Sequence, residues 1–140
     1  MKMLTIGLGI VALLGLALWV NSALYASRIT KQHPASGDLI EVNGADVHVL
    51  KQGETGPVVL MIHGASANAR EFSWSLAPRL SETHRVLMMD RPGHGHSERL
   101  GGAEQLEIQA AQAAGVLRSL APNEKAVIVG HSFGGAVSLR

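Results

Sequence analysis

The sequence predicts an α/β domain whose sheet is mainly parallel with an antiparallel hairpin at its edge, preceded by a hydrophobic N-terminal helix. Three observations support this fold class. A hairpin signal opens the domain, short apolar runs then alternate with helical segments, and an uncharged stretch precedes them all. Strands that alternate with helices favour parallel pairing, because each helix carries the chain back to the same end of the sheet.

Composition indicates a globular domain and excludes several functions. The 140 residues include 12 basic and 11 acidic side chains, and this balance gives no electrostatic signature of nucleic-acid binding. The chain has no cysteine, which excludes disulfides, thiolate metal sites and cysteine nucleophiles. A chain of this length can bury one core. Its seven histidines remain available for chemistry.

Residues 1–26 predict a membrane anchor. Residues 3–20 read MLTIGLGIVALLGLALWV without a charge, and a helix of that length measures about 27 Å, close to the apolar core of a bilayer. Trp19 and Tyr25 stand where interfacial aromatic residues are expected. We favour an anchor in contact with the membrane through residues 3–25 over a cleaved signal segment or a buried core helix. The apolar run is longer than in most signals, and no clean cleavage site follows it.

The side of the membrane on which the following domain lies stays open. Lys2 on one side of the span opposes Arg28 and Lys31 on the other, so basic residues give no clear orientation. A cleaved signal segment would make the domain secreted or periplasmic. Residues 27–37 turn polar and predict a linker to a domain over residues 38–140.

The domain is expected to begin with a hairpin and to continue with three buried strands. Residues 39–42 and 45–50 flank Asn43-Gly44, a pair that favours a two-residue turn. Continuous apolar runs predict strands covered on both faces. These runs are VVLMI at 58–62, RVLMM at 85–89 and AVIV at 126–129.

Two helical segments are expected between the buried strands. The first covers about residues 71–80 and the second about residues 103–120. In the second, apolar residues recur at alternating steps of four and three, and we expect Gln109, Gln112 and Arg118 to lie mostly outside this stripe. The stripe consists of Leu106, Ala110, Ala113, Leu117 and Leu120.

The last buried strand is followed by GHSFG at residues 130–134, which fits G-x-S-x-G between a strand and a helix. So sharp a turn strains the backbone of the serine and requires neighbours without side chains, here Gly130 and Gly134. The turn lifts the hydroxyl of Ser132 clear of the backbone, which predicts a nucleophile. The amide of Phe133, at the start of the helix, is expected to point where an oxyanion would form.

Two further residues flank this turn. We expect Gly135 to let the following helix approach the sheet, and the side chain of His131 to point away from the serine hydroxyl. A glycine-rich turn whose serine merely caps a helix is the alternative interpretation of the motif.

The chain from residue 38 to residue 140 resembles the α/β-hydrolase family, in which G-x-S-x-G forms a nucleophile elbow. His63-Gly64-Ala65, after the first buried strand, is similar to the HGx oxyanion loop of that family, which implies a second oxyanion N–H from Ala65. DRPGHGHS at residues 90–97 is similar to its D-x-P-G-x-G-x-S loop. The resemblance implies a carboxylesterase-like or lipase-like serine hydrolase that acts on an ester or related small acyl substrate through an acyl-enzyme on Ser132. It implies no cofactor and no metal.

Other polar residues of these loops are expected to support the site. We expect His63 to order its loop through hydrogen bonds, and Asp90 to bind local amides instead of acting as an acid. His94 and His96 alternate with glycines and suggest a metal pair, but no carboxylate or third histidine stands at a suitable spacing.

The acid and the histidine of the family triad follow the serine in the chain. Here eight residues follow Ser132 and all seven histidines precede it. The resemblance therefore implies that both groups lie beyond residue 140, and we expect the sequence by itself to be inactive. We interpret it as the N-terminal part of a longer protein, with a naturally short, inactive homologue as the alternative.

Other functions stay open on the same scaffold. Carbon–carbon bond hydrolysis and perhydrolysis are the alternatives among enzymes, and a catalytically silent, membrane-attached binding module is the alternative outside them. Haloalkane dehalogenase and epoxide hydrolase relatives are disfavoured, because they carry Asp where this sequence has Ser132.

Overall fold

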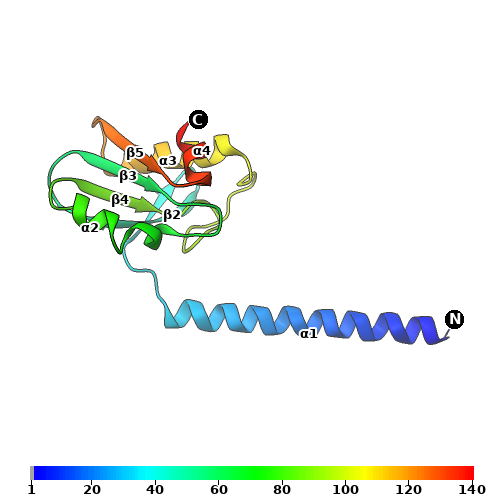
Figure 1. The fold of residues 1–140 in the computed structure, drawn as a ribbon. Helices are drawn as coiled ribbons and strands as arrows, with labels where there is room; N and C mark the ends of the chain where they lie inside the picture. Colours follow the sequence, from blue (N-terminus) through cyan, green and yellow to red (C-terminus); the bar gives the residue numbers. More distant parts are fainter. Residues whose placement is uncertain (1) are drawn as a thin grey trace. The chain divides into compact units, whose positions relative to one another are not determined.

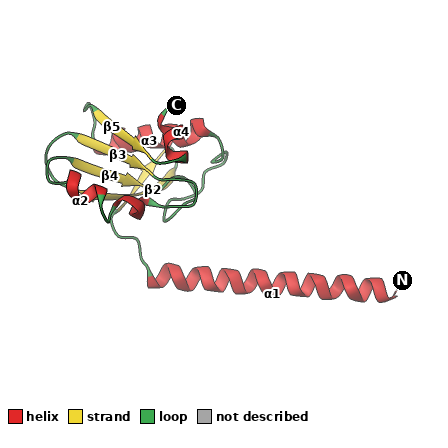
Figure 2. Cartoon of the chain, viewed as in Figure 1, coloured by secondary structure: helices red, strands yellow, loops and turns green. Residues whose placement is uncertain are grey.

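A computed structural model describes residues 2–140 of the chain, which forms two compact units, one up to Pro34 and one from Ala35 onward. The first unit is the helix α1 (Lys2–Gln32), drawn in red in Figure 2. Its stretch Ile6–Ile29 has a mean hydropathy of 2.0, and its apolar side chains are exposed. By length and composition, α1 is therefore able to cross a membrane.

The helix α1 extends further than the expected anchor. Residues 27–32, expected as part of a linker, are helical, and only residues 33–37 connect α1 to the first strand. The stretch from Ser27 to Gln32 contains no glycine or proline, so nothing in it interrupts a helix. Pro34 disfavours helical geometry in the residue before it, which accounts for the end of α1 at this point.

The second unit contains a mixed sheet of five strands in the order β1-β2-β4-β3-β5 (Figure 1). Strands β1, β2 and β4 pair antiparallel, and β4, β3 and β5 pair parallel. The predicted combination of an antiparallel edge hairpin with parallel inner strands is confirmed, although half of the strand pairings are antiparallel. The strands are β1 (Asp38–Val42), β2 (Ala45–Gln52), β3 (Val58–Ile62), β4 (Arg85–Met89) and β5 (Ala126–Gly130).

The turn between β1 and β2 has the geometry that its sequence predicts. Asn43 and Gly44 have φ values of 52° and 81°, and Val42 pairs directly with Ala45. Two positive φ values are characteristic of the type I′ turn, whose twist matches that of the flanking strands. The Asn-Gly pair therefore sets the register of the hairpin.

Strand β3 forms the centre of the core, and all five of its residues are buried. Its alternate side chains enter two apolar clusters, one on each face of the sheet. Leu60 packs toward α3 (Leu106–Leu120), whereas Met61 packs toward η1 (Ala69–Phe72) and α2 (Leu76–Leu80). Burial of one such side chain contributes about 1.5–3 kcal/mol.

Strand β5 differs from the prediction that it is covered on both faces. It lies at the edge of the described sheet, and Val127 and Ile128 are 57% and 42% exposed. Its apolar sequence resembles that of β3, but it has only β3 beside it among residues 2–140. The apolar run therefore predicted the strand correctly, but the predicted covering of both faces is wrong for the described residues.

The prediction of a single helix over residues 71–80 is wrong. The structure contains the short 3-10 helix η1 and, after a turn, the α-helix α2. Pro78 lies in the first turn of α2, where no backbone N–H is needed. In a helix that began at residue 71, the ring of Pro78 would collide with the carbonyl of Trp74, which explains the division.

The helix α3 begins three residues later than expected, at Leu106, and its buried face is more polar than expected. Gln109 and Gln112 are 3% and 1% exposed, which contradicts their expected place outside the apolar stripe. Oε1 of Gln109 accepts a hydrogen bond from Arg91, and Oε1 of Gln112 accepts one from Asn43. Buried amides are stable when such partners exist.

Candidate active site

The parallel strands β3, β4 and β5 end at one edge of the sheet, and the loops that follow them meet there (Figure 1). The loop after β5 is bound to β3, because the His131 N–H donates to the carbonyl oxygen of Ile62 at 3.0 Å. The loop after β4 is bound to the loop after β3, since the Arg91 N–H donates to Nε2 of His63 at 3.0 Å. The three motif loops therefore form one continuous region.

Ser132 occupies a sharp turn between β5 and α4 (Phe133–Ser138). Its φ of 50° and ψ of −116° are rare for a residue with a side chain and cost about 1–3 kcal/mol. The Gly135 N–H closes the turn by donating to the Ser132 carbonyl at 3.0 Å. The Ser132 side chain is exposed and makes no capping hydrogen bond to α4. The helix-capping interpretation thus lacks its hydrogen bond.

The glycines around Ser132 lie where the backbone is most crowded. A Cβ atom on Gly130 would collide with the backbone of Gly134, and one on Gly134 would collide with the carbonyl oxygen of Ile62. A Cβ atom on Gly135 would lie 3.6 Å from the nearest carbonyl oxygen, which is an ordinary contact. The expectation that Gly135 permits the approach of the helix is therefore wrong, and Gly134 has this role.

The two amides predicted to bind an oxyanion belong to Ala65 and Phe133. Among residues 2–140, neither N–H group donates to a protein acceptor. Phe133 is the first residue of α4, and the first amides of a helix have no partner within it. The two loops are in contact, because a Cβ atom on Gly64 would lie 3.5 Å from Cβ of Ser132.

Glu71, in η1, joins the loop after β3 to the turn after β5. Its Oε2 accepts a hydrogen bond from the Gly64 N–H at 3.1 Å, and its Oε1 pairs with Nδ1 of His131. The His131 side chain is thus directed to Glu71 and not to the Ser132 hydroxyl. Glu71 was expected to lie in an ordinary helix, because nothing in its local sequence indicates these two partners.

His63 is buried and has one defined tautomer. Its Nε2 accepts from the Arg91 N–H, so Nδ1 carries the proton and donates to the Gly64 carbonyl oxygen at 2.8 Å. Burial, the largest effect, lowers the pKa of His63 below its ordinary value of 6.5, and the charge of Arg91 acts in the same direction. His63 orders its loop through hydrogen bonds, as expected, and the structure adds that it does so as a neutral ring.

Arg91, in the loop after β4, is 2% exposed. Its side chain contacts the loop after β3 and the start of α4. Its guanidinium donates to the carbonyl oxygens of His63, Gly64 and Ala65 and to Oε1 of Gln109. It also lies 4.8 Å from the centroid of the Phe133 ring. Desolvation lowers the pKa of Arg91, although a guanidinium stays protonated in proteins. No sequence pattern indicated these contacts.

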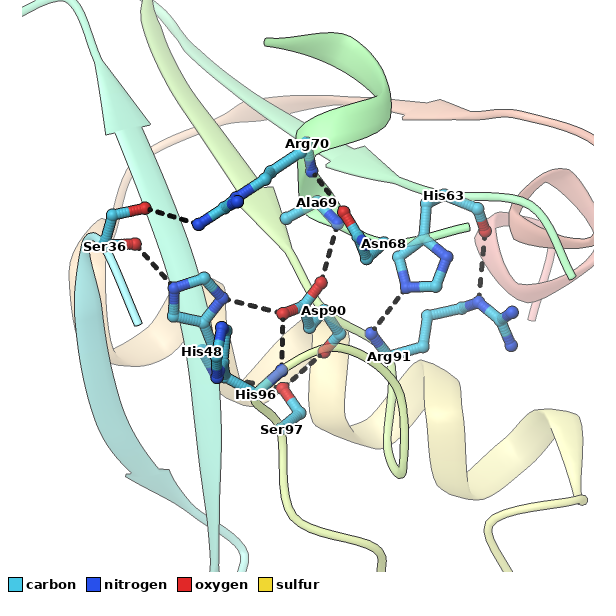
Figure 3. A network of polar contacts seen from close by, with 10 residues as sticks. All are labelled: Ser36, His48, His63, Asn68, Ala69, Arg70, Asp90, Arg91, His96 and Ser97. Atoms are coloured by element: carbon cyan, nitrogen blue, oxygen red, sulfur yellow. Dashed lines mark hydrogen bonds and ion pairs between the residues drawn. The ribbon is translucent and has the colours of Figure 1, made fainter. Parts of the chain in front are cut away.

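Asp90 is buried at the centre of the network drawn in Figure 3. Its Oδ1 accepts from the Ala69 N–H at 2.6 Å, and its Oδ2 accepts from the His96 N–H at 2.9 Å. Nδ1 of His48 lies 2.7 Å from Oδ2, and the opposite nitrogen of that ring lies 2.6 Å from the Ser36 carbonyl oxygen. Asp90 thus binds an amide of its own loop, as expected, and also binds the distant Ala69 amide and His48 ring.

The histidines of the same loop have separate partners. Nε2 of His94 lies 3.1 Å from the carbonyl oxygen of Ala65, whereas the ring of His96 packs edge-on against that of His48. In the part of the chain that the structure describes, no three His, Asp or Glu side chains gather at a spacing that suits a metal ion.

Comparisons with known proteins agree with this geometry. Residues 59–140 match the model of the Alpha/beta hydrolase family. The chain belongs to the α/β-hydrolase family. It is 32% identical over 95 residues to 2-(acetamidomethylene)succinate hydrolase of Mesorhizobium japonicum, covering 68% of this chain and 33% of that protein. It is 34% identical over 114 residues to an esterase of Mycobacterium tuberculosis, covering 79% and 37% respectively.

Solved structures of α/β-hydrolases share the same fold. Epoxide hydrolase A from Mycobacterium thermoresistibile superposes with a TM-score of 0.67 and 27% identity, covering 74% of this chain and 33% of that one. The chain thus spans about a third of the length of the relatives it matches. The part of the α/β-hydrolase fold that is present is the mixed sheet with the elbow after β5.

A hollow of about 370 Å³ borders this α/β-hydrolase elbow. Ala65 and Phe133, the two residues with unpartnered amides, line it together with Arg91, His94 and Arg99. A larger hollow of about 500 Å³ lies between α3, β5 and α4, and none of the predicted site residues lines it. We therefore place the candidate site at the smaller hollow, which reaches the turn through Phe133, the residue after Ser132.

Proposed function

We propose that this protein is a membrane-anchored serine hydrolase that uses Ser132 to attack the acyl carbonyl of an ester or related small molecule. One observation carries the proposal. Ser132 has a strained backbone and an exposed side chain, and the amides of Phe133 and Ala65 beside it have no protein acceptor among residues 2–140. A hydroxyl next to two free N–H groups suits a reaction that develops negative charge on a carbonyl oxygen.

The reaction would proceed in two steps. The Ser132 oxygen attacks the carbonyl carbon while a histidine takes its proton, and the resulting oxyanion accepts hydrogen bonds from Ala65 and Phe133. The tetrahedral intermediate then expels the alcohol, which takes the proton from the histidine. Water attacks the acyl-enzyme in the same way and releases the acid. We expect the histidine and the acid that orients it to follow residue 140.

Relatives favour hydrolysis as the reaction class. They include an esterase and a hydrolase of an acetamidomethylene substrate. Epoxide hydrolase chemistry is disfavoured despite the structural likeness, because the nucleophile of those relatives is Asp. Hydrolysis of a carbon–carbon bond remains the second candidate, since a 2-hydroxymuconate semialdehyde hydrolase of Pseudomonas is 36% identical over 93 residues.

The test uses the full-length protein. We expect a fluorophosphonate probe to label Ser132, and the Ser132→Ala variant to lose both labelling and the hydrolysis of a p-nitrophenyl ester. Loss of a nucleophile lowers kcat by several orders of magnitude, about 10⁶-fold in a serine protease. An alanine variant that hydrolyses the ester at an undiminished rate would show that Ser132 is not the nucleophile and would favour a silent binding module.

The membrane anchor is a separate proposal that rests on α1. A helix with a predominantly apolar, exposed stretch of 24 residues should keep the protein in the membrane fraction during an alkaline carbonate wash. Recovery of a soluble form that begins between Ala23 and Lys31 would identify the segment as a cleaved signal.

A further inference from the structure

The direction of the Ala65 N–H group is set by the opposite side of its own peptide bond. The carbonyl of Gly64 and the N–H of Ala65 belong to one planar trans peptide unit and point in opposite directions. The Gly64 oxygen accepts from Nη2 of Arg91 at 2.8 Å and from Nδ1 of His63 at 2.8 Å. These two short hydrogen bonds, together with a longer one from the Ala67 N–H at 3.4 Å, hold the peptide plane, so they also aim the N–H on its other side.

The peptide units on either side are held by the same guanidinium. Nε of Arg91 donates to the His63 carbonyl oxygen at 3.1 Å, and Nη2 reaches the Ala65 carbonyl oxygen at 3.2 Å. Arg91 therefore binds three consecutive carbonyl oxygens. The rotation of any one of these peptide units would break a hydrogen bond to a buried cation, which costs more than the loss of a neutral one.

The side chain of Arg91 is itself held in place by Gln109 of α3. Its Nη1 donates to Oε1 of Gln109 at 2.8 Å, and Nε2 of Gln109 donates to the Ala103 carbonyl oxygen at 2.7 Å. Among residues 2–140 no carboxylate pairs with this buried guanidinium, so backbone and amide oxygens stabilise its charge. The same guanidinium packs against the ring of Phe133, the residue with the second free amide.

We propose that Arg91 is a positioning residue for the oxyanion site, which it builds by fixing the peptide plane that carries the Ala65 N–H. The inference rests on the proposed function and goes beyond it by assigning a positioning role to a buried cation. Donation to the Gly64 oxygen also polarises the peptide, which makes the Ala65 N–H a stronger donor. An amide fixed before the reaction needs no reorganisation when charge develops.

Lysine cannot replace this function. Its ammonium is a single point of charge, whereas the planar guanidinium has donors in fixed directions that reach several acceptors at once. Arg91→Lys keeps the positive charge but loses the geometry. This substitution therefore separates positioning from electrostatic attraction.

The test compares Arg91→Lys with wild type in the full-length protein. We expect kcat for a p-nitrophenyl ester to fall by about 10-fold to 100-fold, because displacement of one donor affects mainly the transition state. We expect KM to change by no more than about threefold, because the substrate carbonyl in the ground state depends less on these amides. The inhibition constant of a trifluoromethyl ketone, which forms an oxyanion adduct with serine, should rise in parallel with the fall in kcat.

One control variant and one further test variant separate positioning from folding. Val116→Ala removes methyl groups from the buried side of α3, so it lowers stability without contact to the loop and should leave kcat and inhibitor affinity unchanged. Gln109→Met leaves Arg91 in place but removes its rear acceptor, and we expect a fall in kcat of a few fold in the same direction. This second variant tests the inference even where Arg91→Lys does not fold.

The outcomes distinguish the inference from the proposed function. If wild type is labelled at Ser132 and both Arg91→Lys and Gln109→Met keep its kcat and inhibitor affinity, the positioning role is wrong and the hydrolase stands. A loss through KM alone, or an equal loss in Val116→Ala, also overturns the inference. If Ser132→Ala keeps full ester turnover, the proposed function is wrong and the role of Arg91 falls with it.

Discussion

Asp90 and Arg91 are neighbours at the end of β4, and both are buried charges, yet the protein stabilises them in opposite ways (Figure 3). Asp90 receives donors from two backbone amides and from the ring of His48. Arg91 donates to backbone carbonyls and to the amide of Gln109. Successive side chains at a strand end point to opposite sides, so each charge organises a different region.

This difference divides one motif into two functions. Asp90 closes its own loop and binds the hairpin through His48, at a distance from the elbow along the sheet edge. Arg91 binds the loop after β3, which lies beside the turn that contains Ser132. We therefore expect a change at Asp90 to act mainly on stability, and a change around Arg91 to lower kcat beyond what any loss of stability explains.

The largest effect should come from Asp90→Ala. This variant leaves His48 and the amides of Ala69 and His96 without their acceptor in a buried site, and we expect a loss of about 3–5 kcal/mol in the free energy of unfolding. Urea denaturation measures it. Asp38→Ala is the matched control, because it breaks only an exposed ion pair with Lys51 and should cost at most about 1 kcal/mol. An Asp90→Ala protein that is fully stable but inactive would contradict the assignment of a stabilising role to Asp90.

A smaller loss should follow from crowding on the elbow side. Gly134→Ala pushes a methyl group against the carbonyl oxygen of Ile62, so we expect a loss of about 1–3 kcal/mol or more together with reduced turnover. Gly135→Ala, one residue along α4, has room for the methyl group and should be neutral or stabilise by up to about 1 kcal/mol. Equal thermal midpoints for the two variants would contradict the assignment of the close contact to Gly134.

Substitutions of Glu71 test the loops around Ser132, because glutamine has nearly the same shape as glutamate. Glu71→Ala leaves the Gly64 N–H without an acceptor, and we expect a loss of about 1–3 kcal/mol and a fall in kcat of a few fold. Glu71→Gln keeps an oxygen for that amide but loses the charge opposite His131, so it should recover most of the stability. If glutamine is as damaging as alanine, the contact of Glu71 with His131 matters more than its hydrogen bond to the loop.

The mildest perturbation is a change of pH that acts on His63. Because burial lowers its pKa below 6.5, the unfolded chain binds a proton near that pH which the folded protein does not bind. The neutral ring contributes its full stability above pH 6.5, and this contribution is lost progressively as the pH falls from 6.5 toward the pKa of the folded state. Urea midpoints on both sides of pH 6.5 measure the slope. His63→Gln should flatten it, and an unchanged slope would assign the effect to another group.

Much of the fold could be predicted from local sequence. The apolar run of β3 and the Asn43-Gly44 turn indicate their structures within a few residues, and the structure places both where the sequence does. The helix over residues 71–80 failed because the effect of Pro78 depends on where a helix starts. Gln109 was misplaced because a polar residue in a helix is buried only if a distant partner binds it, here Arg91.

The candidate site was predictable in part for the same reason. Gly130, Ser132 and Gly134 carry their signal in their spacing, since a tight strand-to-helix turn tolerates few residue types. Glu71 and Arg91 carry no such signal, because an isolated charged residue in a loop or a short helix is normally solvated. Their roles arise only when the fold brings the loops after β3, β4 and β5 together.

The exposed strand β5 has a practical consequence for recombinant work. Its free edge presents unpaired backbone groups beside the exposed side chains of Val127 and Ile128, and such an edge accepts a strand from another molecule. A preparation of residues 1–140 should therefore self-associate through strand addition, and detergent that solubilises α1 would not prevent it. Aggregation, seen as turbidity, would then limit measurements on that preparation.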